Sequence, residues 1–154
     1  MPFVNKIEAR AYARATEILE RVASSVQSVF PENLRQNLVM SKSKAEGQAG
    51  DAIVVITATL EGQENCEPVI DYVFEQMDSQ SRRAIEHSLD IRLDDDCVFF
   101  LRIDKQAAFL GSMKIAGESD LISARFHFKQ YPRCKREEVL LLIENRLRSA
   151  GGLA

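Results

Sequence analysis

Cationic and aromatic side chains occupy one side of several alternating stretches of this sequence. In each stretch every second residue is apolar, which is typical of a β-strand with one buried face. The residues on the polar side include Arg10, Tyr12, Arg14, Arg92, Arg102, Arg125, His127 and Lys129, and Phe100 shares the register of Arg102. Arginine and lysine pair with phosphates while aromatic rings stack on bases, so the pattern predicts a surface for single-stranded RNA. An ordinary solvated sheet face has the same spacing and stays open as a second interpretation.

Residues that could support catalysis or hold a metal ion are scattered along the chain. Three aspartates occupy positions 94–96, but no calcium-loop ligands follow them, so a solvated turn is favoured. Neither His87 nor His127 has a second histidine or a cysteine at zinc-binding spacing. The loop from Gly47 to Gly50 leads into a strand, whereas a phosphate-binding loop leads into a helix. We therefore predict no metal, no cofactor and no enzymatic activity, with a small enzyme whose cleft the sequence hides as an alternative.

The three cysteines predict the compartment. Cys66, Cys97 and Cys134 are odd in number and lie more than 30 residues apart. This spacing predicts neither a disulfide framework nor a zinc pair, and a reducing cytoplasm is the simplest location.

No apolar run approaches the roughly 18–20 residues of a membrane-spanning helix, so we expect no membrane contact.

Charge is distributed unevenly along the 154 residues, whose net charge is -3. Residues 1–59 carry a net charge of +1, residues 60–120 carry -8 and residues 121–154 carry +4. The overall balance excludes a promiscuous polycation that coats nucleic acid. It leaves room for RNA bound on one face, because several cations fall on predicted strands.

Strands and helices alternate along the chain. Strands are predicted over residues 7–14, 38–42, 52–60, 97–103 and 121–131, with 89–93 pairing with 97–103 as a hairpin. The run 52–60 is the most strand-prone and is expected at the centre of the sheet. Helices are predicted from a cap at Thr16 to Pro31, over 68–77 with Pro68 in the first turn, over 79–89 after a cap at Asp78 or Ser79, and over 137–147. A helical turn and a small strand at 113–115 are expected between 104 and 120.

This arrangement indicates an α+β fold of two layers. One-sided strands and one-sided helices favour a mostly antiparallel sheet with helices packed on one face. We expect a single domain over residues 1–148, followed by a flexible C-terminal tail over residues 149–154.

The stretch Leu101–Gly111 reads Leu-Arg-Ile-Asp-Lys-Gln-Ala-Ala-Phe-Leu-Gly. It resembles the hallmark of an archaeal family whose members are described as RNA-binding-domain proteins or predicted exosome subunits. Weaker matches are Glu46-Gly47-x-x-Gly50 and Tyr131-Pro132, and the resemblance runs from residue 3 to about residue 147. Gln48, Asp51 and Ala52 stand where the family has histidine, asparagine and proline, so no role is carried over to those positions. The resemblance implies a fold similar to the ribosomal protein that contacts 5S ribosomal RNA, with RNA and exosome or ribosome-associated proteins as partners.

The centre of that stretch has a structural and a functional interpretation. Asp104 follows a strand and is expected to cap a short helical turn. Lys105 and Gln106 would then project from the start of the turn, where they could meet a phosphate or a base edge. Both residues therefore join the predicted RNA surface.

Two functions follow from these patterns. The first is a non-catalytic RNA-binding module, accessory to RNA processing or ribosome-linked complexes. The second is a protein-interaction subunit that uses a sheet edge or a helix face without RNA contact, which the acidic middle segment favours.

Overall fold

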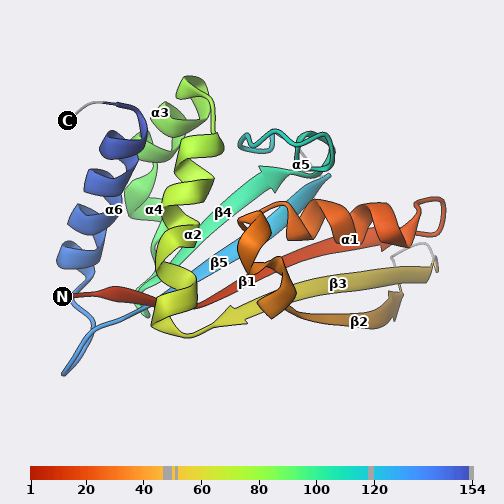
Figure 1. Cartoon of the computed structure of the whole chain (residues 1–154), viewed down its shortest axis with the longest axis horizontal. Coiled ribbons are helices and arrows are strands. Elements are labelled where there is room, and N and C mark those ends of the chain that lie inside the picture. The colour runs from red at the N-terminus through yellow and green to blue at the C-terminus, as the bar shows by residue number, and fades with distance from the viewer. Residues whose placement is uncertain (47–49, 51, 118–119, 153–154) are drawn as a thin grey trace.

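A five-stranded antiparallel sheet forms one layer of the protein, seen here in a computed structural model (Figure 1). The structure describes residues 1–46, 50, 52–117 and 120–152. The strands lie in the order β2-β3-β1-β5-β4. Their bounds are β1 Phe3–Arg14, β2 Val39–Glu46, β3 Ala52–Glu61, β4 Val98–Asp104 and β5 Leu121–Lys129.

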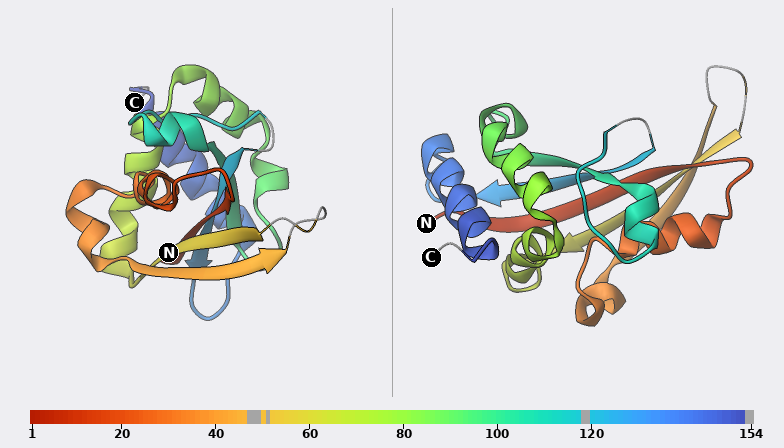
Figure 2. Two further views of the ribbon diagram at one scale, coloured as in Figure 1. Left: turned by 90° about the vertical axis from the view of Figure 1, so that its right-hand side faces the viewer. Right: turned by 90° about the horizontal axis from the view of Figure 1, so that it is seen from above.

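Helices form the second layer. Their bounds are α1 Leu19–Gln27, α2 Gln63–Gln76, α3 Ser79–His87, α4 Leu89–Arg92, α5 Lys105–Phe109 and α6 Arg136–Ala150, with a 3₁₀ segment at Glu32–Asn37. In the end view of Figure 2 (left) the sheet curves, and α1, α2 and α5 lie on its inner side. The predicted α+β class and the packing of helices against an antiparallel sheet are confirmed.

Strand alternation separates a core face from an open face. On the core face, alanines at positions 9, 11 and 13 of β1 are buried, and their small side chains let α1 and α2 approach the central strand. Phe99 of β4 packs against Phe126 of β5 and edge-on against Phe74 of α2. The polar residues of the same strands consequently face away from the helices.

The predicted hairpin at residues 89–103 is wrong. Residues 89–92 form the short helix α4, and only Leu93 bridges to Phe99. Arg136 of α6 donates to the carbonyl oxygens of Asp90 and Leu93 and so fixes this turn from outside. Five alternating residues are too few to distinguish a strand from a helical turn, and here the tertiary contacts decided.

Several predicted boundaries also change. The first helix begins at Leu19 after Ile18, because Glu17 turns back to accept a hydrogen bond from the Arg14 amide at 3.0 Å. Thr16 is therefore not its cap. The second helix begins at Gln63, which places Pro68 in its interior. The central strand is β1, with β3 beside it.

The observed ends of β2, α3 and α6 agree only in part with the predicted ones. Strand β2 extends to Glu46, and most of the expected Gly47–Gly50 loop and Asp51 lie outside the described residues. Asp78 caps α3 as predicted, by accepting from the Ser81 amide at 2.7 Å. Helix α6 continues to Ala150, into the segment expected to be a tail, whose positions 153–154 are not described. The single domain over 1–148 stays a prediction.

The cysteines depart from the prediction. Cys97 and Cys134 form a disulfide across 37 residues of chain, joining the start of β4 to the segment before α6. Spacing along the chain cannot reveal pairs that the sheet brings together, and this disulfide removes the cysteine argument for a cytoplasmic location. Burial, together with the charges of Glu61 and Glu67, raises the pKa of the Cys66 thiol to about 12, so it is no nucleophile. Among the described helices, none is long and apolar enough to cross a membrane.

Candidate nucleic-acid interface

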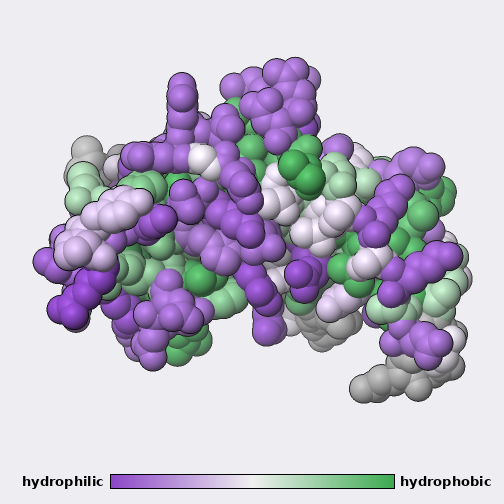
Figure 3. Space-filling view, turned by 90° about the horizontal axis from the view of Figure 1, so that it is seen from below, coloured by the Kyte–Doolittle hydropathy of each residue, from purple (hydrophilic) through white to green (hydrophobic). Residues whose placement is uncertain are grey.

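The open face of the sheet carries three exposed arginines on adjacent strands. The register places Arg10 of β1 beside Ser123 of β5, and Ser123 beside Arg102 of β4. One step along β5, Arg125 lies between Glu8 and Phe100. Figure 3 views the molecule from below, where hydrophilic side chains gather across the middle with hydrophobic patches between them. We name Arg10, Arg102 and Arg125 the arginine triad.

Aromatic rings border the arginine triad. The Arg125 guanidinium lies 5.5 Å from the centre of the Phe100 ring. On β1, Tyr12 is 56% exposed and stands two residues from Arg10 on the same face. A planar cation and an aromatic ring can each stack on a base, so the face combines charge with stacking surface.

The arginine triad has no acidic partner within 4.0 Å among the described residues. Glu8, which the register places beside Arg125, instead accepts a hydrogen bond from His127 at 2.8 Å. Burial raises the pKa of Glu8, but this hydrogen bond and the charges of Lys6, His127 and Arg125 outweigh burial, so its pKa lies below the ordinary value. Glu8 is therefore ionised at neutral pH and offsets part of the positive charge.

Arg92 reaches the same surface from an unexpected element. It lies on α4, where its Nε donates to the Ser88 hydroxyl at 2.7 Å. Burial and the nearby charge of Arg102 lower the pKa of Arg92. Arg92 thus places a further positive charge near Arg102, beside the edge strand β4.

A second aromatic and cationic cluster lies at the other end of β5. The Lys129 ammonium is 5.4 Å from the centre of the Tyr131 ring, and the Phe3 ring is 6.5 Å from Tyr131. Lys129 and Tyr131 are exposed. Arg14 is exposed at the far end of β1, so the predicted residues span most of the length of the sheet. Phe3 and Tyr131 were missed because each lies at an end of the alternating pattern.

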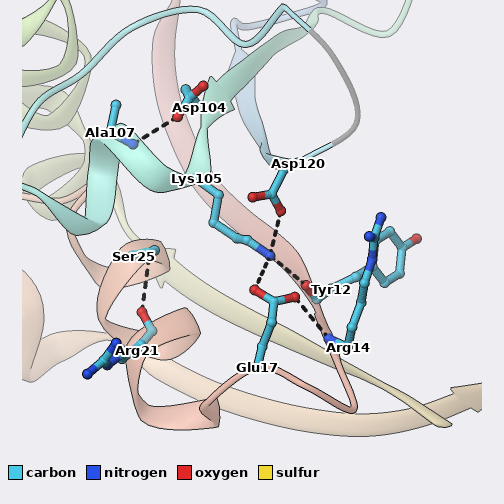
Figure 4. A network of polar contacts seen from close by, with 9 residues as sticks. All are labelled: Tyr12, Arg14, Glu17, Arg21, Ser25, Asp104, Lys105, Ala107 and Asp120. Carbon is cyan, nitrogen blue, oxygen red and sulfur yellow. Dashed lines mark hydrogen bonds and ion pairs between the residues drawn. The ribbon is translucent and has the colours of Figure 1, made fainter.

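Lys105 does not project outward as predicted. It is only 6% exposed, and its ammonium pairs with Glu17 at 2.8 Å and Asp120 at 2.7 Å (Figure 4). Its third hydrogen bond, at 3.1 Å, goes to the carbonyl oxygen of Tyr12. Lys105 thus ties together the end of β1, the turn before α1 and the start of β5. We name Lys105, Glu17 and Asp120 the lysine corner.

Of the residues next to Lys105, Asp104 has a structural role and Gln106 lies on the surface. Asp104 caps α5 as expected, since its carboxylate accepts from the Ala107 amide at 2.8 Å. Gln106 is exposed, with no side-chain hydrogen bond recorded to a described residue. Within the described part of the chain, no three histidine, cysteine or acidic side chains gather as a metal site would need.

A family model described as RNA binding matches residues 6–128 of the chain. An uncharacterized protein of Methanocaldococcus jannaschii is 29% identical over 149 residues, covering 94% of this chain and 98% of that protein. A protein of Pyrococcus abyssi named RNA-binding protein PAB1135 is 26% identical over 137 residues, covering 88% of each.

Solved structures share the fold. A crystal structure of an Archaeglobus fulgidus protein from the family model DUF54 aligns with a TM-score of 0.78 at 25% identity, covering 93% of this chain and 99% of that one. A DUF54 protein from Methanothermobacter thermautotrophicus aligns with a TM-score of 0.76 at 24% identity, covering 94% of this chain and 98% of that one. The arrangement of sheet and helices is thus shared along nearly the whole chain.

Proposed function

Because this chain belongs to the RNA-binding family, whose model spans most of its sheet, we propose that it binds single-stranded RNA across the open face of the sheet. The phosphates pair with the arginine triad and with Arg92, while unstacked bases lie against Phe100 and Tyr12. Lys129 and Tyr131 hold the strand at the other end of β5. The relative named for RNA binding supports the same assignment.

The observation that carries this proposal is the unpaired state of the arginine triad. Several arginines elsewhere make ion pairs: Arg146 binds Glu67 and Asp71, and Arg148 binds Glu144. On the open face three neighbouring guanidiniums stay exposed without such partners. Clustered like charges destabilise a folded protein unless a counter-charge arrives, and a phosphate backbone supplies one.

A salt series with labelled RNA tests this proposal. The probe is a mixed-sequence single-stranded oligonucleotide, titrated by fluorescence anisotropy against the wild type and the variant Arg10→Ala/Arg102→Ala/Arg125→Ala. Each phosphate contact contributes roughly -0.7 to the slope of log affinity against log salt, so we expect the triple variant to lose about 2 from that slope and at least about tenfold in affinity.

The matched control removes three cations elsewhere. Lys42→Ala/Lys44→Ala/Arg83→Ala gives the same net charge, but these exposed residues lie on the other side of β2 and on α3. Its salt slope should match that of the wild type. Equal losses in both triple variants, or no binding by the wild type at low salt, would contradict the proposed site.

We further propose that the protein acts by binding alone, in the cytoplasm, as an accessory to RNA-processing or ribosome-linked complexes. The description of its family names binding and no reaction, which supports a non-catalytic role. The exosome or ribosome-associated partners are those that the sequence resemblance implies. Purification of the protein from its native cells, with and without nuclease, tests whether such partners are held through RNA.

A second candidate function rests on the N-terminal end of the molecule. A hollow of about 450 Å³ lies beside α6, and its lining combines the apolar Met1, Pro2, Leu141 and Leu142 with the polar Glu138, Asn145 and Arg146. Leu141 is 59% exposed, which favours contact with another protein at a helix face. A Leu141→Glu variant that loses a nuclease-resistant partner while keeping RNA affinity would support this function.

A further inference from the structure

A cavity of about 260 Å³ lies where α1 and α5 meet, beside the lysine corner. Its lining includes Glu17, Arg21, Ser25, Gln106 and Phe109. Figure 4 shows α1 and α5 facing each other across this region, with Arg21 and Lys105 on opposite sides. Its volume lies just below the roughly 300–1,000 Å³ of pockets for drug-sized molecules, which suits one small ring system.

One wall of the cavity is a stacking surface. The Arg21 guanidinium lies 5.7 Å from the centre of the Phe109 ring. Phe109 is 39% exposed, which is unusual for a phenylalanine that could pack in a core. Among the described residues, Arg21 has no carboxylate within 4.0 Å. Both groups are therefore available to a flat ligand.

The polar part of the lining offers hydrogen bonds and little net positive charge. Lys105 uses all three of its N–H donors within the protein. Glu17 and Asp120 more than offset the charge of Lys105, so inorganic phosphate would find a single guanidinium, that of Arg21, to pair with here. Gln106 presents an amide with two donors and an acceptor at the start of α5, which suits the edge of an uncharged ring.

The cavity also begins where the open face ends. Glu17, on its lining, accepts from the amide of Arg14, whose side chain belongs to the open face. A strand that passes Tyr12 and Arg14 can thus turn around the end of β1 and reach the cavity.

We propose that this cavity receives a nucleobase, stacked on the wall of Arg21 and Phe109 and held at its edge by Gln106. The base is an unstacked one from the RNA strand, and in that respect the inference rests on the proposed function. The ribose and phosphate stay outside, toward Arg14.

Two-dimensional ¹⁵N NMR tests the cavity with small probes. The four nucleoside 5′-monophosphates are titrated in turn, with inorganic phosphate as a separate arm. We expect saturable shifts at the Gln106 side-chain amide and at the backbone amides of Arg21 and Phe109 with at least one nucleotide, and none there with phosphate. Phe109→Ala should weaken binding at least about fivefold, in line with the cost of losing one base stack.

The control is Leu110→Ala, which removes an exposed apolar side chain next to Phe109 but outside the lining. It should bind nucleotides as the wild type does. Gln106→Ala provides a second variant at an exposed position, for use if Phe109→Ala perturbs the fold. Shifts that are absent at millimolar nucleotide, equal with phosphate, or unchanged in both cavity variants would overturn the proposal.

The two proposals fail in different ways. If the arginine triad variant loses RNA while nucleotide shifts at Gln106 persist, both proposals stand. If the wild type binds nucleotide in the cavity but no RNA, the proposed function fails and the base-binding cavity remains. If RNA binds and neither cavity variant changes nucleotide or RNA affinity, only the cavity is refuted.

Discussion

The arginines of the triad and Lys105 of the lysine corner carry the same positive charge in opposite surroundings. The triad is exposed and has no acidic partner within 4.0 Å among the described residues. Lys105 is buried and all three of its donors are used. Under the proposed function the same kind of charge serves RNA binding in one region, whereas in the other it holds three segments of the chain together. Pairing and burial, rather than residue type, separate the two roles.

The lysine corner should give the largest effect on stability. Lys105→Met leaves two carboxylates and the Tyr12 carbonyl without their common donor. Breaking a buried ion pair costs roughly 3–5 kcal/mol, and because Glu17 and Asp120 are partly exposed we expect a loss of about 2–3 kcal/mol in unfolding free energy. Urea denaturation followed by circular dichroism measures this loss. Arg102→Ala is the comparison and should stay within about 0.5 kcal/mol of the wild type; a similar loss in both variants would remove the distinction.

Sequence reasoning reached most of the open face because strand alternation is a local property. Period-two patterning placed Arg10, Arg102 and Arg125 on the polar side, and the register of the structure puts them together. The same reasoning placed Arg92 on the wrong element, since five residues of alternation also fit a short helical segment. Arg92 nevertheless lies near Arg102, because α4 contacts β4.

The ion pairs of the lysine corner could not be predicted from the sequence, for a different reason. The partners of Lys105 lie 88 and 15 residues away along the chain at Glu17 and Asp120, and no local pattern links them. The disulfide between Cys97 and Cys134 was hidden in the same way. Local periodicity therefore predicts which face a residue occupies, whereas long-range pairing decides whether its charge is free.

On the open face, the largest single-residue effect should come from stacking. Phe100→Leu keeps apolar bulk but removes the ring that lies beside the Arg125 guanidinium. Loss of one base stack costs about 1–3 kcal/mol, so RNA affinity should fall about tenfold while the salt slope stays unchanged. Anisotropy titrations at several salt concentrations separate these two quantities. Val98→Ala, two residues away on the same strand and face, is the control; an equal loss there would indicate general loss of apolar contact.

A smaller effect separates charge from shape within the arginine triad. Arg125→Ala should lower the magnitude of the salt slope by about 0.7, as expected for one phosphate contact with a single strand. Arg125→Lys keeps the charge and should restore that slope, but it lacks the planar guanidinium that packs on Phe100 and should still bind a few-fold more weakly than the wild type. The salt series of the previous test measures both variants. A lysine variant indistinguishable from the alanine variant would argue against a phosphate contact at this position.

The smallest effect concerns Glu8, the acidic residue within the open face. Its pKa lies below the ordinary value of 4.5, so the folded state holds its proton less tightly than the unfolded state does. Its contribution to stability is therefore present above about pH 4.5 and is lost as the pH falls through the lowered pKa. Glu8→Gln should flatten the pH dependence of unfolding free energy below that pH, by less than about 1 kcal/mol because the group is partly exposed.

The same substitution acts on binding in the opposite direction. At neutral pH Glu8→Gln removes the negative charge beside Arg125, so the affinity for RNA should rise about twofold at low salt and the gain should fade as salt is added. Glu86→Gln, an exposed position on α3, changes the net charge equally and should leave the affinity unchanged. If both variants gain alike, the response belongs to the net charge of the protein. A gain confined to Glu8→Gln would instead assign the response to the open face, because the register places Glu8 beside Arg125, where its charge offsets the positive charge that a phosphate would meet.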